Sequence, residues 1–212
     1  MRTFPVTHSI PSAEHLAEVV KADYDLGPRL ECRLFRSGIA DTYDVRAGSR
    51  RFMLRICRVA WTTRAGISYE VDALLHLCAR RAPVAGPVAR RDGGYITYIA
   101  APEGRRLAVL FAYASGREHV RDIATSKSYG DALARIHNAG EGFTSRRARA
   151  PIDANFLVRR PLARLTPLAV EHPKAWGYLA KLGRKLDGRL EETGRGLSTG
   201  LCHGDSHGGN AS

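Results

Sequence analysis

The spacing of apolar residues changes partway along the chain. In the first half, three short runs at 29–35, 42–46 and 51–58 alternate between apolar and polar residues, which is the pattern of β-strands. Turn-forming residues separate these runs, first at Ser37-Gly38 and then at 47–49. We therefore expect the three runs to form consecutive strands of an antiparallel sheet.

Two helices are predicted around these strands. Ser12 is a suitable N-cap for a helix that runs to about Tyr24. Another helix is predicted over 63–81, because apolar residues recur there at helical spacing. Further strands are predicted at 87–90, 95–99 and 106–112. The first half is therefore a small, mostly β region with one helix packed against its strands.

Helical spacing dominates from residue 119 onward. One helix ends at Gly140 and another spans 176–190, because apolar residues recur there every three to four positions. His137 falls on the apolar face of the first of these helices, which predicts a hydrogen-bonded core histidine. The pattern as a whole predicts an α+β protein with two lobes. The predicted lobes are 1–113 and 114–212.

Composition and charge exclude several classes of protein. With 44% hydrophobic and 25% charged residues, the chain is not typical of a disordered, collagenous or coiled-coil protein. No apolar run approaches the ~18 residues of a membrane helix, and the N-terminus lacks the apolar stretch of a signal peptide, so we expect a cytoplasmic protein with no membrane partner. The 33 basic residues exceed the 21 acidic ones, but they are spread along the chain, which disfavours nucleic-acid binding. The four cysteines form no CxxC pair, which disfavours a zinc knuckle or a disulfide framework.

The chemistry-bearing residues are concentrated near the C-terminus. Asp205 follows His203-Gly204, and Asn210 comes five positions later in a glycine-containing segment. This spacing matches the aspartate and asparagine of a kinase catalytic loop. In such a loop the aspartate takes or orients the proton of the accepting hydroxyl group, and the amide oxygen is a ligand of a magnesium ion that bridges the nucleotide phosphates.

The segment resembles the catalytic loop HGDxxxxN of the aminoglycoside phosphotransferase (APH) family of kinase-like enzymes. The preceding residues 130–137 are similar to the helix that lies before that loop in the family. The resemblance implies a protein-kinase-like fold and an ATP-dependent phosphotransferase that acts on a hydroxyl group of a small molecule. It implies Asp205 as the catalytic residue, Asn210 as the metal ligand, and ATP and Mg²⁺ as cofactors.

Two other interpretations of the segment remain open. His203, Asp205 and His207 alternate as they would in a metal cluster, and the segment is superficially similar to the loops of metallophosphoesterases. Those sites need further ligands at the ends of earlier strands, and the sequence has no upstream Asp-x-His pair. The segment is also compatible with an ordinary structural loop.

A second clue lies in the predicted strand 51–58. Alternation puts Leu54 on one face and Arg55 on the other, and both faces carry apolar residues, so Arg55 points inward. Glu70 lies at the edge of the apolar stripe of the following helix. We expect the two charges to pair, because each is costly to bury alone. The resemblance implies that this pair holds the α- and β-phosphates of the nucleotide; the alternative is a surface arginine beside an ordinary amphipathic helix.

The remaining predicted nucleotide contacts rest on weaker signals. The loop 36–43 would lie over the phosphates, with Ser37 and Gly38 at its turn. It lacks the GxGxxG pattern, and a loop of this kind is more often a simple hairpin turn. The resemblance implies that Phe111 and Tyr113 belong to the hinge beside the adenine ring.

The chain departs from the family pattern after the catalytic loop. The family has a further aspartate on the next strand as its principal magnesium ligand, followed by helices of the acceptor pocket, whereas two residues follow Asn210 here. We therefore expect an incomplete helical lobe and a truncated chain that is inactive or impaired. A non-catalytic nucleotide-binding remnant and a basic nucleic-acid-binding protein are the alternatives. Neither the acceptor nor the oligomeric state is indicated.

Overall fold

The chain is divided into two compact units. The computed structural model describes residues 5–116, 122–147, 149 and 151–207. One unit comprises residues 1–148 together with 200–212, and the other comprises residues 149–199. The predicted boundary near residue 113 stays a prediction.

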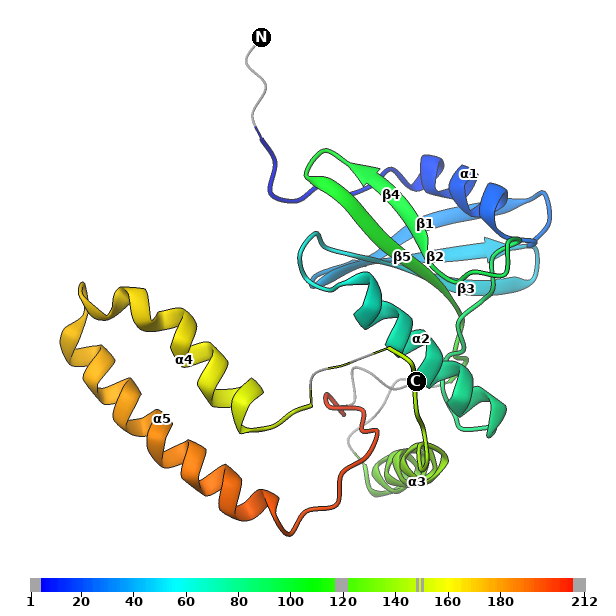
Figure 1. Cartoon of the computed structure of the whole chain (residues 1–212). Coiled ribbons are helices and arrows are strands. Elements are labelled where there is room, and N and C mark those ends of the chain that lie inside the picture. Colours follow the sequence, from blue (N-terminus) through cyan, green and yellow to red (C-terminus); the bar gives the residue numbers. More distant parts are fainter. Residues whose placement is uncertain (1–4, 117–121, 148, 150, 208–212) are drawn as a thin grey trace. The chain divides into compact units, whose positions relative to one another are not determined.

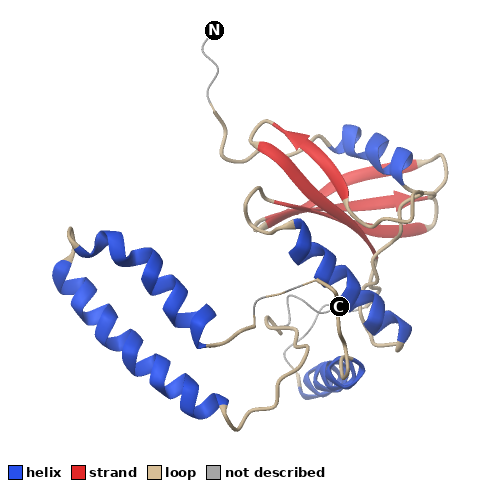
Figure 2. Cartoon of the chain, viewed as in Figure 1, coloured by secondary structure: helices blue, strands red, loops and turns tan. Residues whose placement is uncertain are grey.

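An antiparallel sheet forms the centre of the first unit (Figures 1 and 2). Its five strands lie in the order β1-β2-β3-β5-β4, which places β3 in the middle. The predicted meander of three strands is confirmed, with each strand paired antiparallel to the next. The strands are β1 (Leu30–Ser37), β2 (Ala40–Ala47), β3 (Arg50–Cys57), β4 (Thr97–Ala101) and β5 (Gly104–Ala112).

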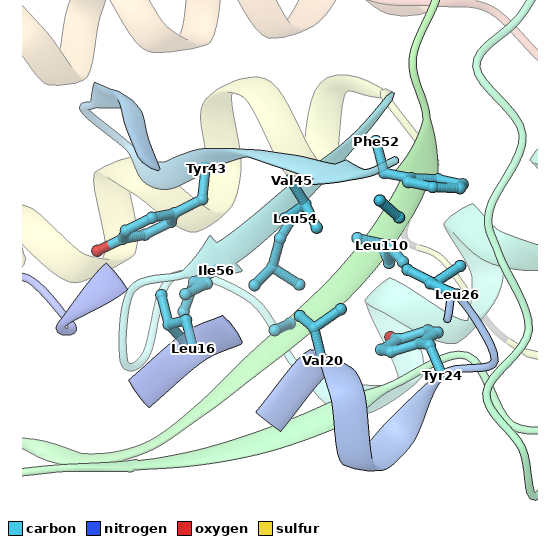
Figure 3. Close-up of a cluster of buried hydrophobic side chains, with 12 residues drawn as sticks. Leu16, Val20, Tyr24, Leu26, Tyr43, Val45, Phe52, Leu54, Ile56 and Leu110 are labelled. Atoms are coloured by element: carbon cyan, nitrogen blue, oxygen red, sulfur yellow. The ribbon is translucent and has the colours of Figure 1, made fainter. Parts of the chain in front are cut away.

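Helix α1 (Ala13–Asp23) packs against one face of the sheet (Figure 3). The helix begins directly after Ser12, as predicted, although the Ser12 side chain makes no capping hydrogen bond. Its buried side chains Leu16 and Val20 meet Leu54 and Leu110 from the strands. Burial of apolar side chains of this size contributes about 1.5–3 kcal/mol each, so this cluster is the main core of the unit.

Helix α2 (Arg64–Ala79) packs against the other face of the sheet. The hydroxyl oxygen of Thr63 caps the helix by accepting a hydrogen bond from the Gly66 N–H at 3.1 Å. Because successive strand residues point to opposite faces, α2 covers side chains of β3 and β5 that α1 does not reach. The buried cluster on this face consists of Cys57, Ile67, Val71, Val109 and Phe111.

The segment predicted as a strand at 87–90 does not form one. Pro87 makes a single bridge to Phe111, and the Val88 N–H donates to the Leu110 carbonyl at 2.8 Å. Proline has no N–H to donate to a ladder, and two residues after Val88 the chain already turns, at Arg90. The prediction of a strand here was wrong for these two reasons.

Helix α3 (Ile123–Ala139) ends at Gly140, as predicted. The Asp122 carboxylate caps its first turn by accepting a hydrogen bond from the Thr125 N–H at 2.7 Å. The described part of the first unit leaves every α3 side chain at least partly exposed. His137 is exposed, so the prediction of a core histidine is wrong: amphipathic spacing does not guarantee that a face is covered.

The regular secondary structure described in the second unit is all helical. Arg159 links two of its helical segments by donating to Asp187 at 2.8 Å and to Glu191 at 2.7 Å. Gly183 is buried against Leu162, where a larger residue would collide with the leucine side chain. The predicted helix at 176–190 lies inside α5. The elements are a π-helical turn (Asn155–Arg159), α4 (Arg160–Leu165), a 3₁₀ turn (Thr166–Ala169) and α5 (Pro173–Gly194).

Two further features bear on the expectations from composition. In the described parts of the chain, no helix has the length and apolar character needed to cross a membrane. The four cysteines are free thiols: Cys57 is buried, Cys32 and Cys78 are half-buried, and Cys202 is exposed.

Candidate active site

The predicted pairing of Arg55 and Glu70 is confirmed. The Arg55 Nη2 atom donates to Glu70 Oε1 at 2.6 Å, joining the middle strand of the sheet to α2. About a third of each side chain is exposed, so the pair lies at the edge of the core and not inside it. The Arg55 guanidinium carbon also lies 4.9 Å from the centre of the Phe111 ring. The pair is therefore fixed in place and still open to solvent.

Helix α2 is held in place on two sides. Its buried residues Ile67 and Val71 flank Glu70 and fix the carboxylate at the edge of the sheet. Further along α2, Asp72 accepts a hydrogen bond from the Ser145 hydroxyl at 2.5 Å. His76 Nε2 lies 3.1 Å from the carbonyl oxygen of Ala139 at the end of α3. The position of Glu70 thus depends on contacts with both the sheet and the segment after α3.

Ser37 and Gly38 lie at the exposed turn between β1 and β2. The Ser37 hydroxyl donates to Asp41 Oδ1 at 2.6 Å, and the Gly38 N–H donates to the Ala40 carbonyl at 3.1 Å. The predicted turn is therefore present, and its side chain and amide are engaged in shaping the hairpin. A role of these two residues in binding phosphate stays a prediction.

A buried ion pair that the sequence reasoning missed lies next to this turn. Arg106 and Asp41 are both fully buried, and the Arg106 Nη2 atom donates to Asp41 Oδ2 at 2.6 Å. The same guanidinium donates to the carbonyl oxygens of Cys57, Ile56 and Ser9. Burial opposes ionisation of the Asp41 carboxyl, but hydrogen bonds from Ser37 and Arg106 outweigh it and lower its pKa. The available signal was the position of Arg106, whose side chain alternation places on the same face as Ala108 and Leu110 in an otherwise apolar stretch.

Phe111 and Tyr113 lie at the end of β5, where the hinge was predicted. Phe111 is buried beneath Arg55, whereas Tyr113 follows the last residue of the strand and is partly exposed. The Tyr113 N–H donates to the carbonyl of Arg51 at 3.3 Å, which continues the pairing of β5 with β3. Their predicted contact with an adenine ring is not tested by these positions.

The loop that carries Asp205 runs beside α3. The Tyr129 and Ser206 hydroxyls are 2.8 Å apart, and Leu201 lies against Gly140 at the other end of the helix. Gly204 has φ of +79°, a left-handed conformation that disfavours residues with a Cβ. The Asp205 N–H donates to His203 Nδ1 at 3.3 Å. These contacts shape the turn that presents the Asp205 side chain, which is 78% exposed.

The metal site is described only in part. Asn210, the predicted metal ligand, lies outside the described residues. His207 Nε2 is 3.7 Å from Asp205 Oδ2, but the described residues include no group of three or more His, Cys, Asp or Glu side chains that could hold a metal ion. Magnesium on a nucleotide is held mostly by phosphate oxygens and waters, with one or two protein oxygens.

Comparison with proteins of known sequence gives one family. Residues 31–211 match the model of the phosphotransferase enzyme family (APH). An uncharacterized protein of Deinococcus radiodurans is 36% identical over 211 residues, which cover 99% of this chain and 61% of the relative. A homoserine kinase of Caulobacter is 28% identical over 192 residues, which cover 86% of this chain and 55% of that enzyme. The chain spans less than two thirds of the length of the curated relatives that it matches.

Comparison with solved structures gives the same fold. An amicoumacin kinase in complex with AMP-PNP and Ca²⁺ superposes with a TM-score of 0.64 at 15% identity, over 92% of this chain and 59% of the other. The predicted α+β, kinase-like fold is confirmed by this likeness. Because the family model covers most of the sequence, from β1 to the Asp205 loop, the chain belongs to the phosphotransferase enzyme family.

Proposed function

We propose that this chain forms the nucleotide-binding part and the catalytic loop of an ATP-dependent phosphotransferase that acts on a hydroxyl group of a small molecule. The observation that carries the proposal is the Arg55–Glu70 pair, a fixed and partly exposed guanidinium on the middle strand. The Asp205 loop belongs to the same compact unit. A guanidinium matches the oxygen geometry of phosphate groups, so Arg55 suits the α- and β-phosphates of ATP.

In the proposed reaction, Asp205 handles the proton. The acceptor hydroxyl oxygen forms a bond to the γ-phosphorus, the bond between that phosphorus and the β–γ bridging oxygen breaks, and ADP leaves. The hydroxyl proton passes to the Asp205 carboxylate. His203 and Gly204 set the turn from which this carboxylate projects. Loss of the carboxylate charge is therefore expected to slow transfer and leave nucleotide binding largely intact.

Magnesium is the proposed metal, with Asn210 as a ligand. When bound, it would neutralise charge on the phosphates during transfer. Arg55 binds and orients the phosphates in the proposal, and Glu70 keeps that guanidinium from turning towards solvent. The hydrogen bond between Arg55 and Glu70 supports both of these proposed tasks.

The acceptor is proposed to be a small molecule that is not strongly cationic. Among the proteins similar to this chain are homoserine kinases and an amicoumacin kinase. The net charge of +12 lowers the rate at which a polycation would approach, whereas a zwitterionic or neutral alcohol is not repelled.

The test separates binding from transfer. Mg-ATP should raise the melting temperature of the 212-residue chain, and Arg55→Ala should remove the shift, whereas Arg58→Ala, an exposed arginine next to the strand end, should keep it. Transfer of the γ-phosphate to a panel of alcohols should fall at least a hundredfold in Asp205→Asn while its melting shift remains. Binding without transfer by the unaltered chain would favour the nucleotide-binding remnant. Absence of any shift at millimolar Mg-ATP would refute the proposal.

A further inference from the structure

Three connections of the first unit lie at the same end of the sheet (Figure 1). Ala40 pairs with Cys57, so the turn between β1 and β2 lies next to the loop that leads from β3 to α2. In that loop, the Val59 side chain lies beside Gly104, where β5 begins after its turn from β4. Segments that are far apart in sequence therefore form one surface at this end.

This surface exposes large apolar side chains. Phe35 and Ile39 of the β1–β2 hairpin are 63% and 61% exposed, and Trp61 and Val59 of the β3–α2 loop are 63% and 40% exposed. We call these four residues the Trp61 patch. The Trp61 N–H donates to the Arg58 carbonyl oxygen at 3.3 Å, so the loop that carries the indole forms a turn. Single exposed apolar residues are common, but four at one end of a sheet are typical of an interaction surface.

Positive charge accompanies the Trp61 patch. The segments 35–40 and 58–66 contain three arginines and no acidic residue. These arginines, Arg36, Arg58 and Arg64, are all exposed. Asp41 and Glu103, which also lie at this end of the sheet, have buried side chains and both contact the buried guanidinium of Arg106. The exposed side chains of the two segments are therefore apolar or positively charged.

We propose that this end of the first unit binds the surface of a lipid bilayer that carries anionic headgroups. The Trp61 patch enters the boundary between headgroups and acyl chains, where tryptophan is favoured, and the three arginines contact the headgroups. Stable attachment to a bilayer takes two signals, and an apolar anchor beside a basic patch supplies both. The inference does not depend on nucleotide binding.

The combination of apolar and basic residues favours a bilayer over other partners. A nucleic acid offers phosphates to the arginines, but no apolar region that Ile39 and Val59 enter. A second copy of this chain, docked through the same surface about a two-fold axis, brings the arginines of one copy towards those of the other, and like charges repel. An anionic bilayer accepts both kinds of side chain.

Binding to a membrane surface needs no spanning helix. The expectation of no membrane partner rested on the absence of a long apolar run, and that criterion detects only segments that cross the bilayer. The residues of the Trp61 patch are separated in sequence, and the pairing of β1, β2 and β3 brings them to one end of the sheet. A search along the sequence therefore misses this surface.

The experiment measures co-sedimentation of the 212-residue chain with vesicles. We expect binding to vesicles of equal parts phosphatidylcholine and phosphatidylserine, and binding at least about tenfold weaker to phosphatidylcholine alone. Ile39→Ser should weaken binding to the mixed vesicles about tenfold. Ile123→Ser is the matched control, because Ile123 belongs to the same unit and is 89% exposed, and it should change nothing.

Two further variants test the charge. Arg58→Gln with Arg64→Gln should weaken binding to the mixed vesicles about tenfold and leave binding to phosphatidylcholine unchanged. Arg146→Gln with Arg147→Gln removes two exposed arginines elsewhere in the unit and should change neither. Circular dichroism of each variant checks that the fold is retained.

Tryptophan fluorescence gives a measurement that does not rely on loss of binding. The chain has two tryptophans, so Trp176→Phe leaves Trp61 as the only one. Its emission should shift to shorter wavelength when mixed vesicles are added, because the indole leaves water. An unchanged spectrum in the presence of bound vesicles would overturn the role of the Trp61 patch.

The remaining outcomes also decide the inference. No binding of the unaltered chain to mixed vesicles would overturn it, as would equal losses in Ile39→Ser and Ile123→Ser. Retention on a DNA fragment without binding to vesicles, or a dimer that Ile39→Ser dissociates, would assign the surface to another partner and overturn the inference too. None of these results bears on the melting shift with Mg-ATP, which tests the proposed function separately.

Discussion

Two arginine–carboxylate pairs lie on opposite faces of the same sheet and differ in what surrounds them. Arg106 and Asp41, on the α1 side, are fully buried, and the guanidinium is enclosed by that carboxylate and by carbonyl oxygens. Arg55 and Glu70, on the α2 side, are about a third exposed and joined by a single short hydrogen bond. The Arg106 guanidinium already uses its hydrogen-bond donors within the fold, so this pair stabilises the structure. The Arg55 guanidinium is partly exposed and still has donors that a ligand could use.

The first and largest test of this contrast is Arg106→Ala. We expect a loss of about 3–5 kcal/mol in the free energy of unfolding, because Asp41 would stay buried and lose its guanidinium partner, with the ring of His8 left beside it at 3.4 Å. Urea denaturation measures it. Arg105→Ala is the control, because Arg105 is the neighbouring residue and is exposed. Its guanidinium carbon lies 4.9 Å from the centre of the Tyr98 ring, so its loss should cost less than about 1 kcal/mol. Similar losses for both variants would mean that the Arg106 pair has no special structural role.

The second test changes the charge of the same pair and its response to acid. Asp41→Asn should cost about 1.5–3 kcal/mol at neutral pH, because charge-assisted hydrogen bonds become neutral ones. The pKa of Asp41 is lower in the folded state than in the unfolded chain, so its contribution to stability is complete above the unfolded pKa and is lost as pH falls below about 4. Unfolding measured between pH 7 and pH 3 should therefore show a shallower decline for Asp41→Asn. An unchanged slope would assign the acid sensitivity to other carboxyls.

The third test removes the open pair. Arg55→Ala should change the free energy of unfolding by no more than about 1 kcal/mol, the range of partly exposed ion pairs. The same urea titration gives the comparison with Arg106→Ala directly. A loss above about 3 kcal/mol would show that Arg55 is needed for folding and would erase the distinction between the two faces.

The smallest effect is expected in the second unit. Arg159 pairs with Asp187 and Glu191, but its side chain is 49% exposed. Arg159→Ala should cost about 0.5 kcal/mol or less, and the difference from the unaltered chain should shrink as salt is added. Thermal unfolding at low and high salt measures both. A cost that does not respond to salt would point to packing of the arginine stem instead of charge.

The local sequence pattern was enough to predict much of the sheet and one contact of the candidate site, the Arg55–Glu70 pair. Alternation, together with turn residues between the runs, predicted the three paired strands, and the 3.6-residue spacing of Ile67 and Val71 predicted α2. The pairing of Arg55 with Glu70 followed from the same logic, since alternation fixes the face of one residue and helical spacing fixes the edge of the other. These predictions succeed because each depends on neighbours in sequence.

The features that the sequence did not reveal depend on distant residues. Arg106 and Asp41 are 65 positions apart in sequence. The Arg106 guanidinium also donates to carbonyl oxygens of β3 and of the segment before α1. The helical turns at 155–169 escaped notice because Pro161 and Pro167 interrupt the apolar spacing. The contacts of Arg51 with Asp44 and with the Tyr113 ring likewise depend on the register of three strands.

Because the four thiols differ in burial, one of them can be labelled selectively with a dye that reports on the catalytic loop. Burial raises the pKa of Cys32 to about 11 and also raises the pKa of Cys57 and Cys78, which slows their alkylation. Cys202 is exposed and stands three residues before Asp205. A maleimide dye at neutral pH should attach there first. Its emission would then track movement of the loop when nucleotide is added, without engineered cysteines.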